Sequence, residues 1–147
     1  MTAANNINDA QLKIERELVE AFYRAFTEKD YAALEKVLTP DWDDIPLAPG
    51  QGPGPEGLKP IMEMVLVALP DVNVAIHDVI QVPGRMAVRA EFSGTHKGPL
   101  FGIEPTGKRV SFRIHEFHTF VDGRIKTTWH LEDWFGLFNQ LGRFPSF

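Results

Sequence analysis

The side chains best suited to chemistry lie in a predicted β-hairpin that covers residues 109–133. Two apolar-rich runs flank Asp122-Gly123, a pair that favours the two-residue type I′ turn. Counting outward from that turn puts the ionisable residues Glu116, His118 and Asp133 on one mostly apolar face. In this register Phe120 faces Ile125, His118 faces Thr127, Glu116 faces Trp129, Ile114 faces Leu131 and Phe112 faces Asp133. Ionisable groups on an apolar face are costly to bury unless they are paired or line a cavity, so we predict the functional site here.

An acid and an imidazole in a dry pocket suit proton transfer at a carbon atom beside a carbonyl group. Such a reaction needs a desolvated base and hydrogen-bond donors for the enolate oxygen. Asp133 is predicted to have apolar neighbours in Phe112 and Leu131. His118 lies some way along the strand from Asp133, so a water molecule, the substrate or a β-bulge would have to close the gap. Glu116 lies between them as a second charged partner.

Structural roles for the same residues stay open. Glu116 and His118 can satisfy each other in a core, and Asp133 can accept a backbone hydrogen bond at a strand end. His96 either lines the cavity or caps the turn in GTHKG. Aromatic pocket walls are predicted at Trp42, Phe101 and Trp129, of which Trp129 is equally consistent with plain core.

A metal site is not expected. His115 and His118 form an H-x-x-H pair, but positions three apart on a strand point to opposite faces. The predicted register instead puts His115 opposite His130 on the outer face, where we expect a solvated pair. The chain has no cysteine, which excludes thiolate ligands and disulfides. No metal site is therefore predicted from the residues.

The composition is that of a soluble globular domain. The chain has 147 residues, 44% of them hydrophobic and 24% charged, which predicts one domain over residues 1–147 with residues 1–8 flexible. No apolar run approaches the roughly 18 residues that a membrane span needs. The first residues lack the features of a secretory signal, so we expect a cytoplasmic protein. A net charge of −5 argues against nucleic acid as a partner.

The hydrophobic periodicity predicts three helices followed by four strands. Apolar residues repeat at helical spacing over residues 8–28, 31–38 and 57–69, with Asp30 as the cap of the second helix. The Pro/Gly-rich residues 39–57 are predicted to form an ordered loop. A period of two over residues 72–82 and 86–96 indicates strands that precede the hairpin. The tail after Asp133 is expected to pack on a neighbour or plug a sheet edge. The predicted class is α+β, with a curved antiparallel or mixed sheet packed against three N-terminal helices.

Three segments resemble the SnoaL-like polyketide cyclase, or ester cyclase, family: APGQGPGPEGLK, AEFSGTHKGPLFGIEPTGKRV and VDGRIKTTWHLEDWFGLFNQLG. The resemblance runs from about Leu18 to Gly142. It implies the cone-shaped α+β barrel named after nuclear transport factor two, and an intramolecular aldol ring closure of an aromatic polyketide ester without a cofactor. By this resemblance Asp133 matches the acid/base carboxylate at the end of the last strand, and His118 matches the assisting histidine. Relatives often have a histidine at the position of Ile45. By this resemblance, a polar contact with the substrate is either missing in this chain or supplied by Asp44.

Three functions compete. The first is a cofactor-free cyclase or isomerase that acts on a small hydrophobic carbonyl compound through Asp133 and His118. The second is a non-catalytic module of the same fold that binds a small apolar ligand or a partner protein, and the third is a hydrolase or dehydratase with the same acid/base pair. A cavity of about 300 Å³ or more with Asp133 and a histidine on its wall would favour an enzyme or ligand binder. Phe117, Thr119 and Val121 on the outer sheet face predict self-association, and the family resemblance implies a homodimer or larger homo-oligomer.

Overall fold

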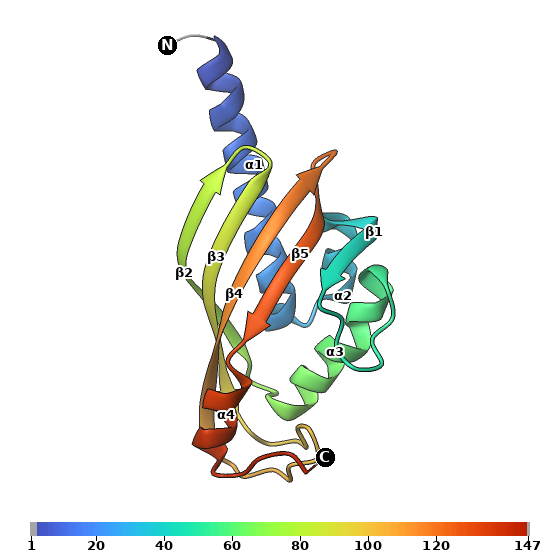
Figure 1. Cartoon of the computed structure of the whole chain (residues 1–147), viewed down its shortest axis with the longest axis vertical. Helices are drawn as coiled ribbons and strands as arrows, with labels where there is room; N and C mark the ends of the chain where they lie inside the picture. Colours follow the sequence, from blue (N-terminus) through green and yellow to red (C-terminus); the bar gives the residue numbers. More distant parts are fainter. Residues whose placement is uncertain (1–2, 147) are drawn as a thin grey trace.

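The computed structural model describes residues 3–146 as an α+β fold, as predicted, built on one five-stranded sheet. Its elements in chain order are α1 (Ala3–Glu28), α2 (Tyr31–Val37), β1 (Leu38–Ile45), α3 (Gly54–Ala68), β2 (Asn73–Val82), β3 (Arg85–Thr95), β4 (Arg109–Val121), β5 (Arg124–Glu132) and α4 (Trp134–Leu141). The strand order is β1-β5-β4-β3-β2, so β1 and β2 are free edges and the sheet is open rather than a closed barrel. Figure 1 shows α1 and α2 behind the sheet, α3 beside and below β1, and α4 at the lower end of the sheet.

The helices follow from the sequence pattern. The repeat of apolar residues in α1 buries Val19, Phe22, Tyr23 and Phe26 against the sheet. Of the residues expected to be flexible, 3–8 continue this helix, while 1 and 2 lie outside the described residues. Asp30 caps α2 as predicted, because its carboxylate accepts a hydrogen bond from the Ala33 amide at 3.2 Å.

The loop predicted over residues 39–57 is wrong in its first part, because Leu38–Ile45 forms strand β1. This strand lies at an edge and runs parallel to β5, with Asp43 beside Thr127 and Ile45 beside Trp129. An edge strand tolerates Pro40, whose missing amide proton would cost a ladder hydrogen bond in a central strand. The remaining Pro/Gly-rich residues connect β1 to α3.

A β-bulge changes the predicted register of the hairpin. Asp122 and Gly123 have φ values of 49° and 70°, so the tight turn forms as expected, and Phe120 pairs with Ile125. Thr119 then pairs with Thr127, which leaves Lys126 as the extra residue.

The bulge exchanges the two faces of β5, because side chains alternate along a strand. Glu116 lies opposite His130 rather than Trp129, and Ile114 lies opposite Glu132 rather than Leu131. Leu131 is 74% exposed on the outer face, where it lies opposite His115. The predicted outer pair of His115 and His130 therefore does not form.

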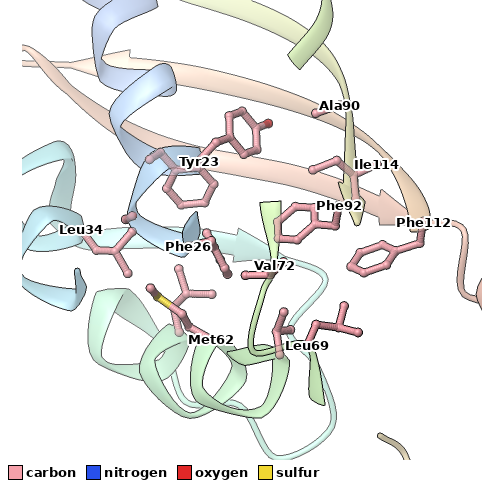
Figure 2. Packing of buried hydrophobic residues seen from close by; sticks show 14 of the residues in the cluster. Tyr23, Phe26, Leu34, Met62, Leu69, Val72, Ala90, Phe92, Phe112 and Ile114 are labelled. Atoms are coloured by element: carbon pink, nitrogen blue, oxygen red, sulfur yellow. The ribbon is translucent and has the colours of Figure 1, made fainter. Parts of the chain in front are cut away.

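The tail forms a fourth helix that packs on its own chain. Leu137 and Leu141 of α4 are buried, and the Trp134 ring lies 4.7 Å from that of Phe112 on β4. The main core fills the space between the helices and the inner sheet face, where Figure 2 shows Phe26, Phe92 and other core side chains converging. No helix within residues 3–146 is both long and apolar enough to cross a membrane.

Candidate active site

Three ionisable side chains meet on the inner face of the sheet. Tyr23 comes from α1, and Glu116 and His118 come from successive inward-facing positions of β4. The Tyr23 hydroxyl donates a hydrogen bond to Oε2 of Glu116, and the Nε2 atom of His118 lies 3.3 Å from both the Tyr23 oxygen and that same Oε2. All three residues are buried, and in Figure 2 the Tyr23 hydroxyl points from its helix towards the sheet.

The other ring nitrogen of His118 extends this group across two more strands. Its Nδ1 lies 3.0 Å from the hydroxyl oxygen of Thr128 on β5, and the indole of Trp42 on β1 donates to the same oxygen at 3.1 Å. We call the five residues Tyr23, Trp42, Glu116, His118 and Thr128 the interior network. Every member is buried, so water competes little with its hydrogen bonds.

The interior network combines a carboxylate acceptor with several hydrogen-bond donors. Burial, followed by the negative charge of Glu116, raises the pKa of Tyr23 well above its usual value, so the phenol keeps its proton at neutral pH. The aromatic ring of Phe22 meets the His118 imidazole edge-on at 5.9 Å and helps to hold it in place. A carboxylate beside a phenol and an imidazole can accept a proton and donate hydrogen bonds in one small volume.

A second charged group lies further along the same inner face, and we call it the strand-end cluster: Asp44, His130 and Glu132. His130 Nδ1 lies 2.6 Å from Glu132, and its Nε2 lies 3.3 Å from Asp44 and 2.9 Å from the Pro46 carbonyl oxygen. Burial alone would lower the pKa of His130, but hydrogen bonds to Asp44 and Glu132 outweigh it and raise the pKa to about 10. The sequence reasoning missed this cluster because only the bulge brings His130 and Glu132 to the inner face.

Asp133 does not have the apolar surroundings that were predicted for it. The residue is exposed, and its carboxylate accepts a hydrogen bond from the Gly136 amide at 2.8 Å as the N-cap of α4. The strand ends at Glu132, so Trp134 rather than Asp133 packs on Phe112. The hydrogen bond from the Gly136 amide is the structural role considered for Asp133 in the sequence analysis. A catalytic role for Asp133 stays a prediction.

The other residues predicted to bind substrate do not lie together in one site. Asp44 belongs to the strand-end cluster, whereas Ile45, Phe101 and Trp129 are each 40% exposed. Phe101 packs edge-on against Trp134, with ring centres 5.0 Å apart. The structure therefore brings Trp42 together with Glu116 and His118, and the other predicted pocket residues lie outside the interior network.

His96 has one satisfied and one unsatisfied ring nitrogen. Its Nδ1 accepts a hydrogen bond from the Thr106 amide at 3.2 Å, across the loop between β3 and β4. Its Nε2 is buried and has no hydrogen-bond partner among residues 3–146. Burial lowers the pKa of His96, which favours the neutral imidazole.

Two cavities lie at other places on the fold. One of about 560 Å³ lies between α1 and the tip of the β4–β5 hairpin, lined by residues that include Ile14 and Phe120. The other, of about 230 Å³, lies on the outer face of the sheet, where exposed residues of β2 and β4 such as Ile80 and Phe117 line it; Glu116 is also among its lining residues. Neither lining includes His118 or Asp133. Across residues 3–146, no group of three or more His, Asp or Glu side chains is placed to hold a metal ion.

Comparison with known proteins supports the resemblance seen in the sequence. The family model described as SnoaL-like polyketide cyclase matches residues 16–141. The structure of TsrD from Streptomyces laurentii is 26% identical with a TM-score of 0.82, over 90% of this chain and 97% of that chain. A "Putative polyketide cyclase" from Bacillus cereus ATCC 10987 is 26% identical with a TM-score of 0.77, over 88% of this chain and 80% of that chain.

A SnoaL-like polyketide cyclase from Agrobacterium tumefaciens strain C58 shares the fold at 20% identity, with a TM-score of 0.71 over 87% of this chain and 98% of that chain. Among curated proteins no significant match is found. The family model covers most of the chain, and structures with the same fold align over nearly all of it. The chain therefore belongs to the SnoaL-like polyketide cyclase family.

Proposed function

We propose that this protein catalyses a cofactor-free acid/base reaction on a small hydrophobic carbonyl or ester compound. The reaction is a cyclisation by intramolecular aldol condensation, or an isomerisation that begins with the same proton transfer. The observation that carries the proposal is the meeting of the buried residues Tyr23, Glu116 and His118 within hydrogen-bonding distance on the inner face of the sheet. Family membership supports the same class of chemistry.

Each of the three side chains has a defined part in the proposal. Glu116 removes a proton from the carbon next to a carbonyl group, and His118 and Tyr23 donate hydrogen bonds to the enolate oxygen that forms. In a cyclisation the enolate carbon then bonds to a second carbonyl carbon of the same molecule, and the resulting alkoxide takes the proton that Glu116 had removed, which restores the Glu116 carboxylate. The Glu116 side chain keeps 8% of its surface exposed and that of His118 keeps none, so Glu116 is the more accessible of the two.

Asp133 is the competing base in this proposal. It matches the family pattern at the end of the last strand, but it is exposed and already engaged with the α4 amide of Gly136. A carboxylate in water has less driving force to take a proton from carbon than one in a dry site. We therefore assign the base to Glu116 and keep His118 as its assistant.

Exchange of carbon-bound protons in D2O tests the proposal without knowledge of the natural substrate. Phenylacetone and methyl phenylacetate serve as ketone and ester probes, and NMR follows the loss of the proton signal beside the carbonyl. We expect the wild-type chain to accelerate exchange and Glu116→Gln to lower the rate by about 10²-fold or more. Asp133→Asn should keep most of the rate if Glu116 is the base.

Glu91→Gln is the matched control, because Glu91 lies on the outer face of β3, where it pairs with Arg113 of β4. Its exchange rate should equal that of the wild type. A Glu116→Gln variant that folds and keeps the wild-type rate would contradict the assignment. If the wild-type chain accelerates neither probe, the non-catalytic alternative gains support, because the interior network already satisfies its own hydrogen bonds.

A further inference from the structure

The interior network contains one residue whose hydrogen-bonding direction is fixed by chemistry. The indole nitrogen of Trp42 can only donate, so the Thr128 oxygen must act as the acceptor of their 3.1 Å hydrogen bond. The structure records only one further partner for this hydroxyl among residues 3–146, the Nδ1 atom of His118 at 3.0 Å. The Thr128 proton therefore has a single buried acceptor available to it.

The hydrogen bond donated by Trp42 also determines which atom donates in the hydrogen bond between Thr128 and His118. If the Thr128 hydroxyl donates to Nδ1, that nitrogen must present its lone pair, and the ring proton must sit on Nε2. Nε2 faces the Glu116 carboxylate and the Tyr23 oxygen, both 3.3 Å away and both able to accept. The chain of donors therefore runs from Trp42 through Thr128 and His118 to Glu116.

The other protonation states of His118 fit the same atoms less well. A proton on Nδ1 alone would put the Nε2 lone pair against the Glu116 carboxylate. A doubly protonated ring would make Thr128 accept two hydrogen bonds, from Trp42 and His118, and would leave the Thr128 proton buried without a partner. The first state sets two acceptors against each other, and the second leaves a buried polar group unpaired. Both arrangements are destabilising, so both states are disfavoured.

We infer that Trp42 and Thr128 are positioning residues that keep His118 neutral with its proton on Nε2. This inference rests on the proposed function for its catalytic meaning: a neutral Nε2–H group is the donor that the enolate oxygen needs beside the Glu116 base. A cationic His118 would instead form a tight ion pair with Glu116 and withdraw that carboxylate from reaction. Trp42 therefore influences the protonation of His118 indirectly, through its hydrogen bond to Thr128.

The protonation state is measurable by NMR of protein with ¹⁵N-labelled histidine, without any substrate. The two ring nitrogens of neutral histidine give well-separated pyridine-type and pyrrole-type signals. The two nitrogen signals of His118 are assigned by their loss in the His118→Gln variant. At about pH 7 we expect Nδ1 to be pyridine-type and Nε2 pyrrole-type. A doubly protonated His118, or one with its proton on Nδ1, would overturn the inference.

Trp42→Phe removes the indole donor and keeps an aromatic ring. The Thr128 hydroxyl is then free to accept from Nδ1–H, so the doubly protonated form of His118 should appear at the expense of the neutral Nε2–H form. Trp129→Phe is the matched control, because Trp129 lies on the outer face and is 40% exposed. It should leave the His118 signals unchanged. An unchanged spectrum in folded Trp42→Phe would exclude the role of Trp42.

Should Trp42→Phe fail to fold, a benzothienylalanine at position 42 removes only the N–H and keeps the bicyclic shape. The same change in the His118 signals is expected, and its absence would again exclude the role of Trp42. The spectra also separate this inference from the proposed function. A neutral Nε2–H His118 in a chain that exchanges no probe protons would count against the catalytic proposal alone, whereas exchange with a different tautomer would count against this inference alone.

Discussion

His130 makes the stability of this protein depend on pH between the usual pKa of histidine and about 10. The usual pKa of histidine is 6.5, and the folded chain raises that of His130 to about 10 through Asp44 and Glu132. Below pH 6.5 the folded and unfolded chains both carry the proton. Between pH 6.5 and about 10 only the folded chain keeps it, so the free energy of unfolding must fall as the pH rises through this window.

The size of the effect follows from the two pKa values. The difference between 6.5 and about 10 corresponds to at most about 5 kcal/mol of folding free energy. The Glu132 side chain keeps 20% of its surface in water, which screens part of the interaction. We therefore expect the folded chain to lose about 2–3 kcal/mol of stability between about pH 6.5 and about pH 9.5.

Urea unfolding followed by tryptophan fluorescence at several pH values measures this loss. His130→Gln should flatten the pH dependence, because the variant has no proton to release at this position. His115→Gln is the control, since His115 is exposed on the outer face and should leave the wild-type slope intact. If His130→Gln loses stability with rising pH as steeply as the wild type, the strand-end cluster is not the cause.

Two further predictions concern the end and the outside of the sheet. Asp133→Ala should lower the free energy of unfolding by about 1 kcal/mol, because it removes the cap on the Gly136 amide, whereas Asp133→Asn should cost less; equal losses in urea unfolding would contradict the capping role. The outer sheet face exposes Phe117 by 60% and Leu131 by 74%, and we expect it to form a homodimer interface that Phe117→Asp disrupts in light scattering. Val67→Asp, at an exposed apolar position of α3, should leave the dimer intact, and a monomeric wild-type chain would refute this interface.

Local signals in the sequence were enough for most of the elements. The apolar spacing of α1, the Asp30 cap of α2 and the Asp122-Gly123 turn each depend on residues close together in the chain. Such features are decided by backbone sterics and by neighbours within a few residues, so they can be read before the fold is known. Strand β1 was hidden because its residues include Pro40, and because only pairing with the distant β5 makes them a strand.

The site shows the same division between local and distant causes. The alternation of side chains along β4 was sufficient to place Glu116 and His118 together on the inner face, and both lie there. Asp133 was misplaced because one extra residue, Lys126, exchanges the faces of β5. The bulge also brings His130 to the inner face, where Asp44 from another strand meets it.

The sequence by itself determined the α+β class, the hairpin turn and the ionisable residues of β4, because each follows from a periodicity or a turn within one segment. Only the tertiary structure decided which groups those residues meet. Tyr23 lies 93 positions before Glu116 in the chain, and Trp42 lies 86 positions before Thr128. Hydrogen bonds between such distant residues depend on packing and register across the whole sheet, and a one-residue bulge is enough to change them.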